Sequence, residues 1–242
     1  MVSFHIVGLG SLGSTIALEI AKRSLATTVN VKLHLYDFDV VEERNVVAQI
    51  FDPEDIGLQK TEAVYRRVTQ YRTVFPEVHE GKVTEDNVAD IGCEDEAIIV
   101  DCVDNLPTRQ LLYRHSLSNS TPVLHVGMST KGMGYVQWNY MFGDRFIDTW
   151  SLSPRNINPT TAESLKSEKS DSHVPPCELS SMRTLILNSS MAAVNALFIL
   201  IGRDITGFVK ESTASEDSSG ILSSWSTDVK SMNLIPELQA MI

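Results

Sequence analysis

The chain places a glycine-rich turn directly after its first apolar run. The turn reads Val7-Gly8-Leu9-Gly10-Ser11-Leu12-Gly13-Ser14, and the run before it covers residues 4–7. Glycines allow a tight turn between a strand and a helix, while free N–H groups and the positive dipole end of that helix favour a polyphosphate. The pattern predicts a nucleotide site on Gly8, Gly10 and Gly13. Such clusters also occur in ordinary turns, so the turn alone identifies no family.

Short apolar runs alternate with helical patterns through the first half of the chain. This alternation predicts an α/β, Rossmann-like fold with a mostly parallel sheet flanked by helices. We predict strands over residues 4–7, 31–36, 97–102 and 123–126, and helices over residues 14–23, 60–71, 108–117 and 178–201. Residues 134–140 alternate polar and apolar side chains, which predicts an antiparallel extension of the sheet.

The length of 242 residues allows one large domain with a sizeable core. We assign residues 1–208 to this domain and residues 209–242 to a segment rich in serine and acidic residues that ends in a C-terminal tail, with 210–227 predicted to be mobile. Residues 143–176 have little periodicity and are expected to form a long crossover loop, which is usually functional or disordered. The apolar stretch 185–201 is interrupted by polar residues and fits a buried helix better than a membrane span.

Charge and cysteine content restrict the partners and the compartment. Lysine and arginine number 20 against 31 acidic residues, a net charge of −11, so we expect no binding to nucleic acid or to anionic membranes. The three cysteines form no Cys-x-x-Cys pair, and no charged-then-apolar leader precedes the first strand. We therefore expect a reducing, cytoplasmic location and no structural zinc. The six histidines show no ligand spacing, so histidines such as His34 and His125 are expected to be core residues.

Four further motifs follow the glycine turn. The second predicted strand ends at Asp37-Phe38-Asp39, Asn45 stands four residues before Gln49, Gly57-Leu58-Gln59-Lys60 opens a helix, and Asp101-Cys102-Val103-Asp104-Asn105 ends a strand. An acid at the position of Asp37 can accept hydrogen bonds from a ribose, although a turn carboxylate is the alternative. With these five elements in this order over about residues 1–127, the chain resembles the ThiF/MoeB/ubiquitin-activating enzyme superfamily.

The resemblance implies a cytoplasmic enzyme that uses ATP and Mg²⁺ to adenylate the C-terminal carboxylate of a small ubiquitin-like or sulfur-carrier protein. It implies that Asp104 holds Mg²⁺, Lys60 reaches the phosphates, Asn45 orients them and Asp37 takes the ribose. The remaining motif positions are expected to line the same cofactor site: Asp39, Gln49 and Asn105. The alternative for Lys60 is an exposed first-turn lysine, which is a poor place for a cation because of the helix dipole.

The chain departs from the family pattern in its cations. Family members carry an arginine before the glutamine that is here Gln49, but this chain has Ala48. They also commonly receive an arginine from an N-terminal helix of the partner subunit, whereas this sequence begins directly at its first strand. Arg44 shares a helical face with Ala48 if that segment is helical, so it is our candidate replacement. The alternative for Arg44 is a solvated surface residue, and other candidate cations exist: Lys22, Arg23 and Arg109.

Cys177 lies before the helix predicted to begin near Glu178, where family members often carry a cysteine that receives the activated carrier. A helix N-terminus can lower a thiol pKa, although Glu178 opposes this effect. Cys102 is expected to pack inside and Cys93 to lie at the surface. The resemblance also implies a homodimer or a heterodimer with a homologue, supported by the helix over residues 185–201.

Two alternatives to the enzyme remain open at this stage. Ala48 favours a catalytically impaired nucleotide-binding scaffold subunit of an activating-enzyme heterodimer. An NAD-dependent oxidoreductase would share the glycine turn and Asp37, but it leaves Asn45, Gln49 and Lys60 unexplained.

Overall fold

The structure is a computed structural model that describes residues 1–128, 133–142, 145–148, 183–206 and 224–228. Its strands are β1 (Val2–Val7), β2 (Val31–Asp37), β3 (Val74–Glu80), β4 (Ala97–Asp101), β5 (Val123–Met128), β6 (Met133–Phe142), β7 (Arg145–Asp148) and β8 (Ser224–Asp228). Its α-helices are α1 (Ser11–Thr27), α2 (Glu43–Ala48), α3 (Lys60–Val68), α4 (Leu106–Asn119) and α6 (Arg183–Thr206). Two short 3₁₀ helices are η1 (Pro53–Asp55) and η2 (Val88–Asp90).

The described strands form one mixed sheet in the order β3-β2-β1-β4-β5-β6-β7, with β8 also paired to β6. Strands β3, β2, β1, β4 and β5 run parallel to one another, while β6 is antiparallel to β5, β7 and β8. This confirms the predicted Rossmann-like α/β fold with its antiparallel extension. The carboxyl ends of β2, β1 and β4 meet at one edge of the sheet, where ligands bind in open α/β folds.

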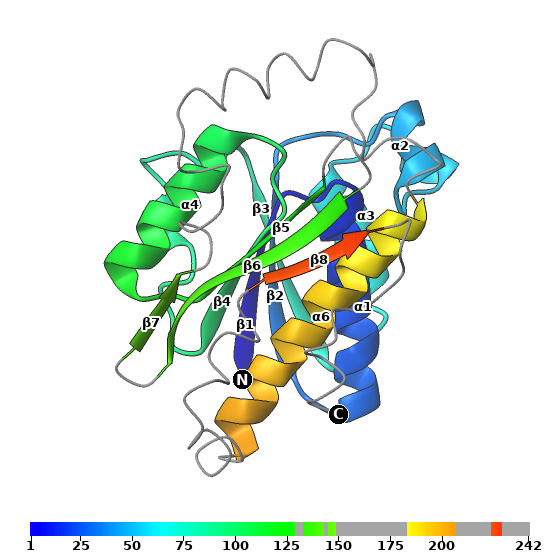
Figure 1. Cartoon of the computed structure of the whole chain (residues 1–242). Helices are drawn as coiled ribbons and strands as arrows, with labels where there is room; N and C mark the ends of the chain where they lie inside the picture. Colours follow the sequence, from blue (N-terminus) through cyan, green and yellow to red (C-terminus); the bar gives the residue numbers. More distant parts are fainter. Residues whose placement is uncertain (129–132, 143–144, 149–182, 207–223, 229–242) are drawn as a thin grey trace.

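Successive side chains of the central strands point to opposite faces of the sheet, and the two faces differ. Phe4 and Ile6 of β1 belong to the larger core cluster, together with Ile16 of α1 and Leu197 of α6. The opposite face packs a smaller cluster that contains Val7 and Leu112 of α4. Figure 1 shows α1 and α6 side by side and α4 apart from them. The smaller cluster leaves part of the opposite face to polar side chains.

Several predicted bounds change in the structure. The predicted strands and helices are found in the described part of the chain, but Asp101 ends β4 and α1 extends at both ends. The strand β3 was not predicted. Residues 224–228 form β8 against β6, so the prediction that this part of 210–227 is mobile is wrong. The crossover loop lies outside the described residues except for β7, and the start of the helix predicted from residue 178 also lies outside them. The domain boundary at residue 208 stays a prediction.

No helix in the described ranges is both long enough and apolar enough to cross a membrane.

Candidate active site

The glycine turn between β1 and α1 leaves open space at one position and none at another. Gly8 has a φ of +89°, and a Cβ there would lie 3.1 Å from backbone atoms of Cys102 and Val103. A Cβ on Gly13 would lie 1.8 Å from the carbonyl oxygen of Gly8, whereas a Cβ on Gly10 would meet no atom within 4 Å. Gly10 is the N-cap of α1, without a side-chain cap, and no acidic residue stands in the first turn. The start of α1 can therefore receive an anion.

Asp37, at the end of β2, holds the glycine turn in place. Its Oδ2 accepts a hydrogen bond of 2.6 Å from the Leu9 N–H, and its Oδ1 accepts one of 2.8 Å from the Asp39 N–H. Burial raises the pKa of Asp37, and the charge of Lys60 and the two backbone N–H groups oppose that rise. Each carboxylate oxygen can accept more than one hydrogen bond, so these contacts leave capacity for a ribose hydroxyl.

Lys60 is the first residue of α3, and only 7% of it is exposed. Its Nζ lies 2.9 Å from Oδ2 of Asp39, and its backbone N–H donates to the Asp39 carbonyl oxygen at 3.0 Å. The alternative of an exposed surface lysine is therefore wrong. A buried cation at the start of a helix is disfavoured by the dipole, so Asp39 stabilises it in this state and a phosphate could do the same.

Both sequence neighbours of Lys60, and also Gln49, carry a buried polar oxygen. Gln49 Oε1, Gln59 Oε1 and Thr61 Oγ1 are buried and have no hydrogen-bond partner among the described residues. Buried polar atoms of a folded protein normally have a partner. Sequence reasoning identified Gln49 but not Gln59 or Thr61, because no local pattern marks an unpaired oxygen.

Asp101 fixes the loop that leads from β4 to Asp104. Its Oδ1 accepts from the Val103 N–H at 3.1 Å, and its Oδ2 lies 2.6 Å from Nδ1 of His125. Arg109 lies 3.4 Å from the same carboxylate and donates to the carbonyl oxygens of Val103 and Val126. Arg109 therefore stabilises the loop that leads from β4 to Asp104. His125 is fully buried, as predicted for a core histidine, and burial lowers its pKa despite the hydrogen bond with Asp101.

Asp104 and Asn105 lie on this loop and are both exposed. The Asn105 side chain accepts from the Thr108 N–H at 2.9 Å and so caps α4. The Cys102 N–H donates to the Val7 carbonyl oxygen at 2.9 Å, which joins the loop to the strand that carries the glycine turn. The structure thus places Asp104 at the same sheet edge as Gly8. A carboxylate oxygen there is a suitable ligand type for Mg²⁺.

The helix α2 carries the segment with Ala48. It spans Glu43–Ala48, so Arg44 and Ala48 lie four residues apart on one helix, as predicted. The Arg44 side chain is 61% exposed and pairs with the carboxylate of Glu42. The Asn45 side-chain oxygen accepts from the Glu42 N–H at 2.8 Å and belongs to a capping box.

The other candidate cations have different contacts. Lys22 pairs with Glu19 at 2.6 Å on the same helix, and Arg23 donates to Asn195 of α6 at 2.7 Å. Arg23 also lies over the Phe198 ring. These contacts make Arg23 part of the packing between α1 and α6.

The two described cysteines, Cys102 and Cys93, have different surroundings. Cys102 is partly exposed and packs against the main core, and burial raises its thiol pKa, as expected for a packed cysteine. Cys93 is exposed, as predicted. Cys177 lies outside the described residues, so its role stays a prediction.

His34 is buried, as predicted for a core histidine, and it also stacks between His5 and His79. The three residues are far apart in the sequence, and the sheet register brings them together.

The chain matches the ThiF family over residues 2–236. It belongs to this family. A relative, the sulfur carrier protein ThiS adenylyltransferase of Escherichia coli K12, is 32% identical over 125 residues, covering 49% of this chain and 46% of the relative. Ubiquitin-like modifier-activating enzyme 5 of Drosophila willistoni is 29% identical over 146 residues, covering 55% of this chain and 35% of the relative. The chain thus spans less than half the length of these relatives.

Solved structures share the fold. Escherichia coli MccB with ATP matches with a TM-score of 0.66 at 14% identity, covering 97% of this chain and 63% of that one. PaaA matches with a TM-score of 0.62 at 16% identity, covering 96% of this chain and 71% of that one. At these identities the matches support the architecture alone.

Proposed function

We propose that this ThiF-family chain uses ATP to adenylate the C-terminal carboxylate of a small ubiquitin-like or sulfur-carrier protein. The observation that carries the proposal is Lys60, a buried cation placed at the N-terminus of α3 beside unpaired polar oxygens. Family membership supports the same chemistry, since the named relatives act on a sulfur carrier and on a ubiquitin-like modifier.

Each candidate site residue has its own role in binding the nucleotide. In this proposal the phosphates lie against the start of α1, where Gly10 leaves open space, and Lys60 leaves Asp39 to reach them. Asp37 accepts the ribose hydroxyls, while Asn45, Gln49 and Asn105 complete the cofactor site. Asp104 would hold Mg²⁺, which supplies charge neutralisation on the phosphates when bound.

The reaction joins two anions. An oxygen of the carrier's carboxylate attacks the α-phosphorus, the bond to the β,γ-phosphates breaks, and pyrophosphate leaves with the electron pair. The products are an acyl adenylate and pyrophosphate. Lys60 lowers the barrier by stabilising the negative charge that develops on the phosphate oxygens.

A thioester step would follow if Cys177 is a nucleophile. Its thiolate would attack the carbonyl carbon of the acyl adenylate, and AMP would leave with the electron pair of the broken C–O bond. Cys177→Ser should then preserve pyrophosphate exchange and remove a thiol-sensitive adduct on gels. An adduct that persists in this variant would exclude Cys177.

The scaffold subunit is the second candidate function. It is favoured by Ala48, where the family carries a cation, and by the pairing of Arg44 with Glu42. It is opposed by Lys60 and Asp104, because a non-catalytic subunit has no chemical need for both.

ATP–pyrophosphate exchange separates these functions. We expect exchange that depends on a small carrier protein ending in Gly-Gly, and Lys60→Ala and Asp104→Ala should each reduce it by about 100-fold or more. Arg66→Ala and Asp86→Ala are matched controls, since both residues are exposed, and circular dichroism checks folding. Nucleotide binding without exchange by the wild-type protein, with any co-encoded carrier, would favour the scaffold.

The choice between Mg-ATP and NADH tests whether the nucleotide site is of the ThiF type. Mg-ATP should raise the melting temperature of the protein by mass action, and NADH should not. Stabilisation by NADH alone would contradict a ThiF-type nucleotide site and support an oxidoreductase.

A further inference from the structure

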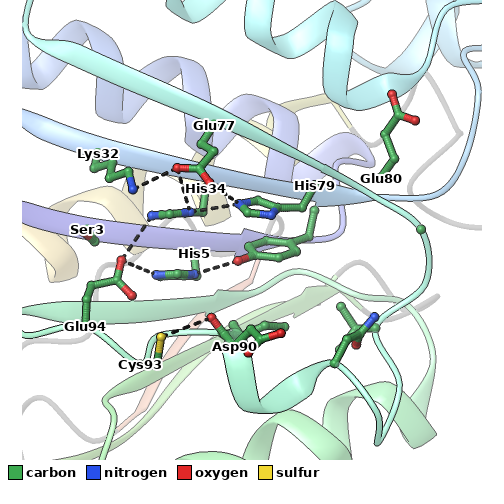
Figure 2. Close-up of a pocket in the computed structure, with 15 residues that line it drawn as sticks. Ser3, His5, Lys32, His34, Glu77, His79, Glu80, Asp90, Cys93 and Glu94 are labelled. Atoms are coloured by element: carbon green, nitrogen blue, oxygen red, sulfur yellow. Dashed lines mark hydrogen bonds and ion pairs between the residues drawn. The ribbon is translucent and has the colours of Figure 1, made fainter.

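A cluster of histidines lies on the polar face of the sheet, away from the glycine turn. Parallel register aligns His5 of β1 with His34 of β2 and His34 with Glu77 of β3, so their side chains share one face. The next row on this face aligns Tyr36 with His79. Figure 2 shows His5, His34, Glu77 and His79 gathered on these strands. Parallel sheets are usually apolar on both faces, so a row of imidazoles is unusual there.

The cluster lines a cavity of about 640 Å³. Strands β1, β2 and β3 form one wall, and the segment 81–94, which contains η2, contributes the other lining residues. Glu94, at the end of that segment, reaches back to the histidines (Figure 2). The cavity therefore joins a covering segment to the sheet through polar side chains.

The inner group of this cluster has three possible ligand atoms. Glu94 Oε1 lies 2.9 Å from His5 Nε2 and 3.1 Å from His34 Nε2. His5 is 1% exposed and His34 is 6% exposed. The His34 Nε2 atom is buried and makes no hydrogen bond within the described residues, although Glu94 is close. A buried ring nitrogen without a hydrogen bond, directed at a carboxylate, suits a shared cation.

Neighbouring groups keep these ligand atoms in the required protonation states. Burial lowers the pKa of His5, and burial together with His5 lowers that of His34 to about 4. Burial alone would raise the pKa of Glu94, but hydrogen bonds from its own backbone, His5 and Ser3 lower it to about 2. Neutral imidazole and ionised carboxylate are the forms that bind metals.

Tyr36 orients the first ligand. Its hydroxyl lies 3.1 Å from His5 Nδ1. When an ion replaces the proton that His5 Nε2 shares with Glu94, Nδ1 can carry the ring proton and donate it to the Tyr36 oxygen. Metal-binding histidines usually donate their second ring nitrogen in this way. The rings of His5 and His34 are parallel with centroids 4.1 Å apart, so their Nε2 atoms must turn slightly toward a common ion.

The outer group is a weaker candidate. It consists of His34 Nδ1, His79 and Glu77. The Lys32 ammonium lies 2.9 Å from Glu77 Oε2, and it occupies that carboxylate and repels a cation. His79 Nε2 is also used in a hydrogen bond of 2.9 Å with His34 Nδ1.

We propose that His5, His34 and Glu94 bind one divalent transition-metal ion, with Zn²⁺ as the first choice, and that this ion fastens the segment 81–94 to the sheet. Two imidazoles and one carboxylate suit zinc, leaving a position for water, whereas Mg²⁺ prefers an all-oxygen shell. None of the three ligands is among the residues assigned to the nucleotide site, and the proposal does not depend on the proposed adenylation.

The test is metal titration of the full chain with its purification tag removed. Isothermal titration calorimetry with Zn²⁺ should give one ion per chain, Co²⁺ should give visible d–d absorption, and Zn²⁺ should raise the melting temperature. His34→Gln and Glu94→Gln should each weaken Zn²⁺ binding by about 100-fold or more. Glu77→Gln is the matched carboxylate control, and His79→Gln, which removes the second histidine of the outer group, is the matched imidazole control.

The outcomes separate the alternatives. Binding lost in His34→Gln and Glu94→Gln but retained in both controls supports the inner site. Absence of Zn²⁺ binding by the folded wild-type chain would overturn the proposal, as would binding that survives His34→Gln. Loss in Glu77→Gln with retention in Glu94→Gln would also overturn it, because the ion would then occupy the outer group. Circular dichroism confirms that each variant is folded.

Discussion

Within the glycine turn, two residues three positions apart have opposite surroundings. The space beside Gly10 is open, while Gly13 packs directly against the carbonyl of Gly8. Gly13 is therefore required by the packing of α1 on the turn. The fold does not require glycine at position 10, and we propose that the open space there serves the approach of a ligand.

Alanine at each position separates packing from binding. Gly10→Ala should fold with a melting temperature near that of the wild type, because its Cβ meets no atom, yet weaken ATP binding by about tenfold or more. Gly13→Ala should destabilise the protein by about 1–3 kcal/mol, because its Cβ overlaps a backbone oxygen. Thermal melts with and without Mg-ATP measure both effects. Equal ATP affinity of Gly10→Ala and wild type would show that the phosphates do not approach Gly10.

Arg44 carries the prediction about the missing cation. If it replaces the arginine absent at Ala48, Arg44→Ala should reduce the adenylation rate by about 100-fold with little change in ATP affinity, as for a contact made in the transition state. Arg44→Ala combined with Ala48→Arg should recover part of the rate. Pyrophosphate exchange measures both variants, and Glu42→Gln is a control that removes only the pairing carboxylate. An active enzyme unaffected by Arg44→Ala would show that the charge comes from elsewhere.

The sequence predicted where single residues lie in the fold when a local motif contained them. The glycines, Asp37 and Lys60 were found because they follow strands or open helices at fixed spacing. The histidine cluster was not found, since His5, His34 and His79 meet only through strand register, and register is a property of the sheet. The available signal was polar residues at alternate positions of strands expected to be buried on both faces.

Among the elements, β3 shows why propensity alone fails at a sheet edge. Its sequence contains Pro76 and alternating polar residues, which argue against a central strand. The strand lies at the edge of the sheet, where a missing N–H is tolerated. The central strands β1, β2, β4 and β5 were predictable because apolar residues occupy at least every second position along most of their length. The crossover loop has no periodic signal from which a structure could be predicted.

A second element-level feature joins η1 to α3. Arg67 of α3 donates to the carboxylates of Asp52, at 2.7 Å, and Asp55. Asp55 also accepts from the Asp52 N–H at 2.8 Å. Burial alone would raise the pKa of Asp55, but these hydrogen bonds outweigh it and lower the pKa. The pair helps to hold the segment before Lys60 in position.

The ion pair of Arg67 and Asp55 predicts that replacing Asp55 lowers the free energy of unfolding by an amount that depends on pH. Because the pKa of Asp55 is lower in the folded state, its contribution is full above the ordinary pKa of about 3.9 and is lost as the pH falls through the folded-state value. Asp55→Asn should cost about 1–2 kcal/mol near neutral pH. Urea unfolding near pH 7 and at about pH 3 should show that the difference in unfolding free energy between the wild type and Asp55→Asn becomes smaller in acid. Asp52→Asn, at an exposed position, should lower the free energy of unfolding by less. If the difference between the wild type and Asp55→Asn does not change with pH, the titration of Asp55 is not its source.

On the scale of the whole molecule, α6 contacts both the first helix, α1, and the last described strand, β8. It packs on α1 through the main core cluster, which contains Ala193, Val194 and Leu197. In the single chain, Leu187 and Met191 of the same helix are 53% and 39% exposed. They lie four residues apart and so share one face. That face fits the dimer interface expected for this family.

The last prediction concerns this assembly. Light scattering coupled to size exclusion should find the wild-type chain as a dimer at micromolar concentration, and Leu187→Lys combined with Met191→Lys should shift it to a monomer. A two-fold interface counts each side chain twice, so losing their burial should raise the dimer dissociation constant by about 100-fold or more. Leu117→Lys, at an exposed leucine of α4, is the matched control and should remain dimeric. A monomeric wild type, or a double variant that stays dimeric, would remove α6 from the interface.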